Sequence, residues 1–208
     1  MEIISHRGYW KKTEEKNTDI AFERSFSLGF GTETDFRDYL GNVVISHDIA
    51  TAACIPAEKC FNSYNLFKCE GTLALNIKAD GLQKSLKQLL EDSQIKNYFT
   101  FDMSIPDTIG YMRESLRFFS RQSEYEPVPA FYEQCNGIWL DAFTGDWYGA
   151  GLIFNHLKCK KQVAIVSPDL HKRDPRPFWE YLKKEKIHSA SDVMICTDLP
   201  EDAKAFFS

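Results

Sequence analysis

The sequence predicts a mixed α/β fold in which a parallel sheet is built from strand–helix units. Eight short apolar runs alternate with amphipathic stretches along the chain. The chain has 208 residues, 43% of them hydrophobic and 26% charged, which is typical of a globular protein. Repeated strand–helix units favour a compact (β/α)8 barrel, and we predict one domain spanning residues 1–208. An open, doubly wound sheet is the alternative arrangement.

The eight expected strands are short runs rich in β-branched and aromatic residues. In chain order they are residues 2–5, 31–36, 72–77, 98–103, 116–120, 137–142, 162–167 and 192–198.

Three segments between these strands have a helical pattern. They are residues 18–30, 81–92 and 175–186. The first of them places four apolar side chains largely on one face, namely Ile20, Phe22, Phe26 and Leu28. Residues 121–134 are interrupted by proline, so at least one helix of a regular barrel is expected to be missing.

The second expected strand contains two acidic residues, Glu33 and Asp35. Because they are two positions apart, both side chains point to the same face of a strand. Burial of two carboxylates is costly unless a cation or a hydrogen-bond donor compensates them. Mg²⁺ and Ca²⁺ bind oxygen ligands of this kind, so the pair is a candidate site for one divalent cation.

Two histidines follow similar apolar segments that contain a serine. His6 follows the first strand, and His47 ends the run VVISH after a turn at residues 39–42. A further strand ends in Asn76 and Lys78, again two positions apart. Active sites of parallel barrels form at the carboxyl ends of the strands, so we expect these residues to meet there.

Together these residues favour hydrolysis of a phosphodiester. A divalent cation and basic side chains would stabilise the charge that grows on the non-bridging oxygens. One histidine would take a proton from the nucleophile, and the other would protonate the leaving alkoxide.

The ordered set of motifs resembles the glycerophosphodiester phosphodiesterase family, which belongs with the phospholipase-C-like barrel phosphodiesterases. The resemblance rests on the segments His6-Arg7-Gly8, EKNTDIAFERSFSLGF, Glu33-x-Asp35, His47-Asp48 and Lys78, and on the closing run MICTDLPEDA. It covers about the first 80 residues and the last 15, whereas the middle of the chain matches only in its alternation of strand and helix patterns.

The resemblance implies a (β/α)8 barrel that binds one divalent cation, Mg²⁺ or Ca²⁺. It implies that His6 and His47 are the catalytic acid and base and that Glu33 and Asp35 bind the metal. By the same resemblance, Arg7 and Lys78 contact the phosphate.

The sequence departs from the family pattern in two places. Asn76 stands where the family has a glutamate, and we expect it to be a neutral third metal ligand that weakens ion binding. In addition, only residues 49–71 follow His47-Asp48, which predicts a reduced cap after the second strand and a more open site. The substrate would be a glycerophosphodiester or a related diester in a lipid head group or glycan.

The net charge of −5 argues against nucleic acid as a partner. No run is long and apolar enough to span a membrane, and the absence of a leader segment predicts a cytoplasmic location. Cys54, Cys60 and Cys69 match no metal-binding spacing and are expected to be free thiols in a loop, although a Cys54–Cys60 disulfide is an alternative. His156 is expected on the surface of a helix.

Two other functions remain open at this point. Asn76 could mark a decayed metal site in a non-catalytic phosphodiester-binding protein on the same barrel. An α/β enzyme of another class would instead require the ordered motifs to be coincidental, and no glycine-rich nucleotide loop or nucleophile elbow supports it.

Overall fold

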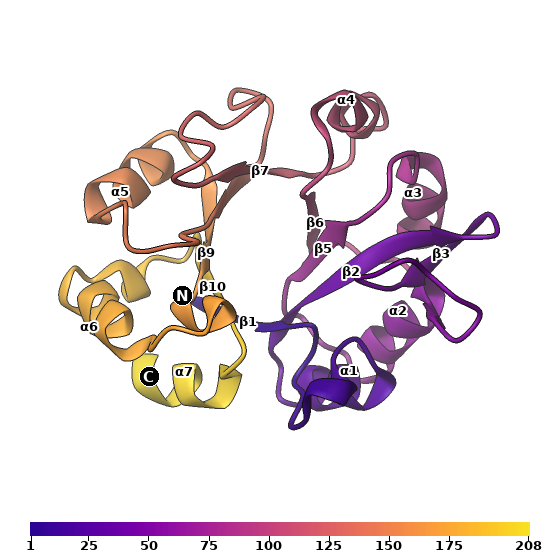
Figure 1. Cartoon of the computed structure of the whole chain (residues 1–208), viewed down its shortest axis with the longest axis horizontal. Coiled ribbons are helices and arrows are strands. Elements are labelled where there is room, and N and C mark those ends of the chain that lie inside the picture. Colours follow the sequence, from indigo (N-terminus) through magenta and orange to yellow (C-terminus); the bar gives the residue numbers. More distant parts are fainter. The chain divides into compact units, whose positions relative to one another are not determined.

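The computed structural model describes residues 1–208 and divides into two compact units. The N-terminal unit is residues His6–Phe118, and the C-terminal unit combines Met1–Ser5 with Phe119–Ser208. No helix in the structure is long and apolar enough to cross a membrane. Both units are mixed α/β (Figure 1).

The strands of the N-terminal unit pair in the order β4–β3–β2–β5–β6. Their bounds are Gly31–Tyr39 for β2, Asn42–Ile45 for β3, Ile55–Pro56 for β4, Leu73–Ile77 for β5 and Tyr98–Phe101 for β6. The β2, β5 and β6 strands are parallel, whereas β3 and β4 are antiparallel to their neighbours. Helices α1 (Asp19–Ser27), α2 (Ala57–Leu66), α3 (Gln83–Asp92) and α4 (Ile105–Arg113) complete this unit.

The C-terminal unit has an entirely parallel sheet with the strand order β1–β10–β9–β8–β7. Its strands are β1 (Glu2–His6, of which Glu2–Ser5 belong here), β7 (Phe119–Gln122), β8 (Gly137–Leu140), β9 (Gln162–Val166) and β10 (Val193–Thr197). Its helices are α5 (Ala150–Lys158), α6 (Arg176–Lys184) and α7 (Pro200–Phe207). Figure 1 shows α5 and α6 on one side of β9.

The mixed α/β fold with a mostly parallel sheet is confirmed, and all eight expected strands are present. The run at 116–120 forms a strand only from Phe119, so β7 begins three residues later than expected. The helical segments appear as α1, α3 and α6. No helix lies between β7 and β8, as the prolines in residues 121–134 predict.

The expected apolar face of the first helix is wrong in part. Ile20 and Leu28 are 45% and 41% exposed, whereas Phe22 and Phe26 are buried. The buried face of α1 is completed by Ala21 and Ser25, at the spacing of one helical face. Leu28 lies just beyond the last helical residue, so the helical period no longer determines where its side chain points.

The segment expected to form a reduced cap after the second strand supplies several side chains to the hydrophobic core. Residues 49–71 instead contain the short strand β4 and helix α2, which contacts both α1 and β3. Phe61 of α2 stacks on Phe36 of β2, with ring centroids 5.7 Å apart. This segment therefore forms part of the core of the N-terminal unit.

The cysteines of this segment are free thiols, but they do not lie together in a loop. Cys60 is fully buried on α2, Cys69 is buried between α2 and β5, and Cys54 is half-buried in the loop before β4. Cys60 and Cys69 belong to the hydrophobic core, where a thiol behaves as a small apolar side chain.

His156 is buried in the C-terminal unit, at 5% exposure, which contradicts the expected surface position. The amide nitrogen of Gln122 donates to the Pro127 carbonyl (2.8 Å), so the Gln122 oxygen is free to accept from Nε2 of His156 (2.7 Å). The Tyr132 hydroxyl then donates to Nδ1 of His156 (2.9 Å). Burial disfavours a charged ring here, so we assign a neutral imidazole to this network, which joins α5 to the irregular segment between β7 and β8.

We expect acid to weaken this network. Burial lowers the pKa of His156 below its ordinary value of 6.5, so the stabilisation is complete above about pH 6.5 and is lost as the pH falls further. His156→Phe should unfold more easily at about pH 8, by roughly 1–3 kcal/mol, because Gln122 and Tyr132 lose their partner. Urea unfolding at about pH 8 and 5 tests this. Between pH 8 and pH 5, the parent and the exposed control His47→Asn should lose more stability than His156→Phe does. Equal losses in all three proteins would show that His156 is not the group whose protonation weakens the fold.

Candidate active site

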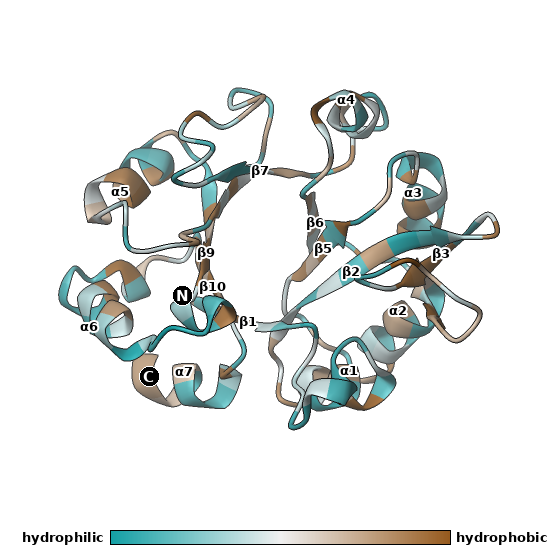
Figure 2. Ribbon diagram, in the orientation of Figure 1, coloured by the Kyte–Doolittle hydropathy of each residue, from teal (hydrophilic) through white to brown (hydrophobic).

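A buried carboxylate pair lies within the N-terminal unit. Glu33 and Asp35 are on β2 and are 1% and 0% exposed. Figure 2 shows hydrophilic residues along much of β2, yet the residues from Thr32 to Phe36 are buried. Burying charged side chains in a strand costs free energy unless nearby groups compensate the charge. A buried acidic pair of this kind therefore marks a candidate functional site.

The last residue of β1 and the residue after it supply the groups that lie near Glu33. The backbone N–H of Arg7 donates to Oε2 of Glu33 (3.1 Å), and Nε2 of His6 lies 3.9 Å from the same oxygen. Arg7 and Gly8 have φ angles of 57° and 80°, in the left-handed region. A Cβ atom on residue 8 would lie 2.8 Å from Cβ of Ala21, so a glycine is required where this turn approaches α1.

Three side chains surround Asp35. Its Oδ2 accepts a hydrogen bond from the amide of Asn17 (2.8 Å) and lies 3.0 Å from Nε of Arg7. Its Oδ1 lies 3.4 Å from Nζ of Lys78. Two cations therefore face one buried carboxylate, which offsets the cost of burying its charge.

Glu33 has much weaker compensation than Asp35. Its burial, together with the negative charge of Asp35, raises the pKa of Glu33 from 4.5 to about 7, although His6, Arg7 and Lys78 oppose the change. Part of the Glu33 population is therefore protonated near neutral pH when no further cation is bound.

Asn76 lies on β5, directly beside Asp35 in the parallel register. Its side-chain oxygen is buried and accepts no hydrogen bond, and the same holds for Oδ1 of Asp35. Oxygens that lack donors are costly when buried, and a bound cation would satisfy both of them. The donor set of two carboxylates and one amide oxygen fits a hard divalent ion such as Mg²⁺ or Ca²⁺.

The structure thus brings together six of the seven predicted site residues within the N-terminal unit: His6, Arg7, Glu33, Asp35, Asn76 and Lys78.

His47 is the predicted residue that the structure does not join to this cluster by a direct contact. The backbone N–H of Ser46 donates to the carbonyl of Asp35 (2.9 Å), so His47 is one residue beyond the position that pairs with Asp35 and two residues beyond the end of β3. Its side chain is 46% exposed, and its Nδ1 is hydrogen-bonded to Asp48 (2.9 Å). That bond is the main reason why the pKa of Asp48 is lowered, and Arg7 makes a smaller contribution.

Asn17 is a site residue that sequence reasoning missed. It occurs in the motif Glu15-Lys16-Asn17-Thr18, which supports the family resemblance, but nothing in the sequence indicates that its amide contacts Asp35. Its φ angle of 58° is also uncommon for a residue other than glycine.

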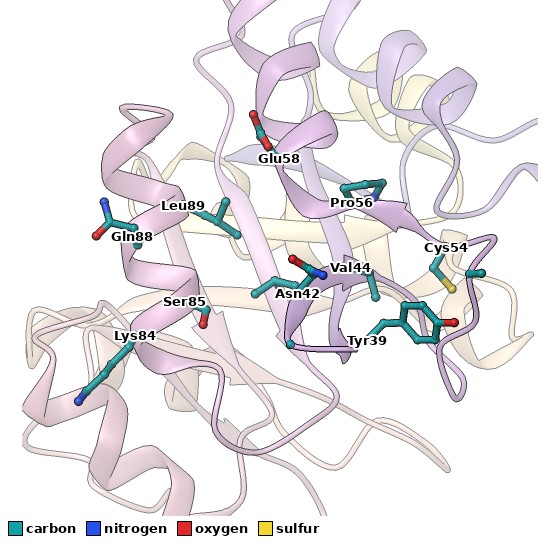
Figure 3. Close-up of a pocket in the computed structure, with 13 residues that line it drawn as sticks. Tyr39, Asn42, Val44, Cys54, Pro56, Glu58, Lys84, Ser85, Gln88 and Leu89 are labelled. Carbon is teal, nitrogen blue, oxygen red and sulfur yellow. The ribbon is translucent and has the colours of Figure 1, made fainter.

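A separate pocket of ≈ 680 Å³ lies between the β3–β4 region and α3. Figure 3 shows Asn42 and Val44 between the α3 side chains Ser85 and Leu89 and the loop that carries Cys54. Its lining includes none of the seven predicted site residues.

Comparisons with known proteins agree with this fold. No family model matches the chain, and no curated protein matches it in sequence. A solved structure from Galdieria sulphuraria, whose assignment as a glycerophosphodiester phosphodiesterase is provisional, matches with a TM-score of 0.78 at 16% identity and covers 99% of this chain and 97% of that chain. The glycerophosphodiester phosphodiesterase of Agrobacterium tumefaciens gives a TM-score of 0.72 at 14% identity, covering 99% and 98%.

A phosphodiesterase of Oleispira antarctica, solved with the product sn-glycerol-3-phosphate, gives a TM-score of 0.74 at 13% identity and covers 99% of this chain and 96% of that chain. Identities this low establish the fold alone. The chain therefore shares, over nearly its whole length, the mixed α/β fold of solved glycerophosphodiester phosphodiesterases.

Proposed function

We propose that the chain is a metal-dependent phosphodiester hydrolase that acts on a glycerophosphodiester or a related diester in a lipid head group or glycan. The observation that supports this most strongly is the buried cluster at β2 and β5, in which Glu33, Asp35 and the donor-free oxygen of Asn76 lie beside two cations. The shared fold adds support, because one protein with this fold binds sn-glycerol-3-phosphate as its product.

Glu33, Asp35 and Asn76 would hold one divalent cation, Mg²⁺ or Ca²⁺. When bound, such an ion withdraws charge from the phosphoryl oxygens and so favours attack at phosphorus. Arg7 and Lys78 would bind the non-bridging oxygens of the diester, where negative charge grows in the transition state.

His6 and His47 would transfer the two protons of the reaction. One imidazole takes a proton from the attacking hydroxyl as the new P–O bond forms, and the other gives a proton to the leaving alkoxide as the old P–O bond breaks. Glu33 lies 3.9 Å from Nε2 of His6, which places that ring beside the carboxylate pair. Asp48 hydrogen-bonds Nδ1 of His47 and would orient that ring.

Two chemical routes fit this arrangement. Water can attack the diester directly and give a phosphomonoester and an alcohol. Alternatively, a neighbouring hydroxyl of the substrate can attack first and give a cyclic phosphate. Phosphorus NMR of the products distinguishes the two routes.

A panel of phosphodiesters, incubated with and without added Mg²⁺ or Ca²⁺, tests the proposal. We expect at least one glycerophosphodiester to be hydrolysed only when a divalent ion is present. The exposed position of His47 favours a second candidate function, a phosphodiester-binding protein without catalysis. Saturable binding of the same diesters without turnover would support that alternative.

Asn76→Glu should tighten cation binding by roughly tenfold, because a charged ligand replaces a neutral one in an oxygen site. Calorimetric titration of the metal-free protein with Mg²⁺ or Ca²⁺ measures this. The exposed Asn62 of α2 provides the matched control, and Asn62→Glu should bind the ion as the parent does. Equal affinity in Asn76→Glu and the parent would show that residue 76 is not a ligand.

A further inference from the structure

The two oxygens of Asp35 have different partners. Oδ2 accepts a hydrogen bond from Nδ2 of Asn17 (2.8 Å) and lies 3.0 Å from Nε of Arg7. Oδ1 accepts no hydrogen bond and has only the ion pair with Lys78, at 3.4 Å. Oδ1 is therefore the oxygen with lone pairs left for a further cation.

The Asn17 amide has a defined orientation. An ionised carboxylate only accepts hydrogen bonds, so the NH₂ group of Asn17 must face Asp35. The fully buried Thr34 hydroxyl donates to the amide oxygen on the other side (2.7 Å). Thr34 and Asp35 are consecutive on β2, so Asn17 bridges two side chains of the same strand.

The Asn17 backbone also supports the segment that contains Arg7. Its N–H donates to the Arg7 carbonyl (2.9 Å), and its φ angle of 58° is a conformation that asparagine and glycine adopt more readily than other residues. The same residue therefore holds the Arg7 turn by its backbone and Asp35 by its side chain.

We propose that Asn17 is a positioning residue that orients the Asp35 carboxylate for cation binding. Asn17 binds Oδ2 with a neutral donor, beside Arg7, and so leaves Oδ1 for the ion. Partners of this kind, which bind a ligand and not the ion, commonly change metal affinity by 10–100-fold when they are removed. The inference rests on the proposed function only in assuming that the ion binds at Asp35.

Asn17→Gly is the decisive variant, because glycine keeps the left-handed backbone and removes only the amide. Lys68→Gly is the matched control: Lys68 also has a positive φ (50°) but is exposed after the end of α2. Calorimetric titration of the metal-free proteins with Mg²⁺ and Ca²⁺ should show roughly tenfold or more weaker binding for Asn17→Gly. Lys68→Gly should bind as the parent does.

A second pair of variants separates positioning from stability. Asn17→Ala adds backbone strain to the loss of the amide, so it should melt at a lower temperature than Asn17→Gly while binding the ion equally weakly. Thr34→Val should weaken binding by less, because it removes only the group that holds the amide. If the affinity for the ion instead decreases in step with the melting temperature across these variants, Asn17 has a merely structural role.

The proposal is overturned if Asn17→Gly binds the ion as tightly as the parent, or if the parent binds neither ion. A diesterase assay on the parent is read independently. If the parent hydrolyses diesters and Asn17→Gly keeps full affinity, the positioning role falls and the proposed function stands. If the parent binds the ion and hydrolyses no diester, the proposed function falls, and the calorimetry still decides the role of Asn17.

Discussion

His6→Asn should lower kcat/KM for the best phosphodiester by at least about 100-fold, which corresponds to about 2.7 kcal/mol of transition-state stabilisation. The reason is that His6 lies at the end of β1, 3.9 Å from Glu33 in the buried cluster, and in the proposed mechanism it would exchange a proton with the substrate. Asparagine keeps a similar size and cannot accept or donate a catalytic proton near neutral pH. The unfolding temperature should stay close to that of the parent.

His47→Asn should have a comparable effect on turnover, although His47 is more exposed. His188→Asn is the control, because His188 belongs to the C-terminal unit and is not one of the predicted site residues. Activity within a few-fold of the parent in either His6→Asn or His47→Asn would refute the role of that histidine. If His47→Asn alone stayed active, only His6 would remain as a proton donor or acceptor.

Glu33→Gln should separate the stability of the protein from its affinity for metal. The folded state raises the pKa of Glu33 from 4.5 to about 7, so the folded protein keeps this proton to a higher pH than the unfolded chain. The free energy of unfolding therefore falls as the pH rises from about 4.5 to 7 and stays lower above pH 7. A shift of this size corresponds to about 3 kcal/mol.

The neutral variant should accordingly be more stable than the metal-free parent at about pH 8, and the difference should shrink towards pH 5. At the same time it should bind Mg²⁺ or Ca²⁺ more weakly, because only Asp35 remains as an anionic ligand. Denaturant unfolding and calorimetric titration measure the two effects. Asp38→Asn, an exposed change on the same strand, should alter neither. A Glu33→Gln variant that is less stable at pH 8 would contradict the burial of an uncompensated carboxylate.

The sequence allows much of the site to be predicted because its residues follow the two-residue period of strands. Glu33 and Asp35 on β2 point to one face, as do Asn76 on β5 and Lys78 just beyond its end, and parallel pairing then places Asp35 beside Asn76. His6 and Arg7 could be predicted because His6 ends β1 and Arg7 comes directly after it. Short-range periodicity is sufficient wherever regular strands alone position the side chains.

Other features depend on contacts between distant segments and could not be predicted in this way. Asn17 lies in an irregular loop, and its contact with Asp35 spans 18 positions. His156 has a polar side chain on an amphipathic helix, and its burial becomes evident only through Gln122 and Tyr132. Residues 49–71 follow the acidic strand as a cap would, but Phe61 and Cys60 show that this segment packs into the core.

Phosphorus NMR of a glycerophosphodiester mixed with the metal-free protein tests the central claim most directly. The diester signal should persist in the presence of EDTA and should convert to a phosphomonoester or a cyclic phosphate once Mg²⁺ or Ca²⁺ is supplied in excess. The His6→Asn variant, treated identically, should leave the diester intact. Equal turnover with EDTA and with added metal, or full turnover by His6→Asn, would contradict the account of a metal-dependent diesterase built on this buried cluster.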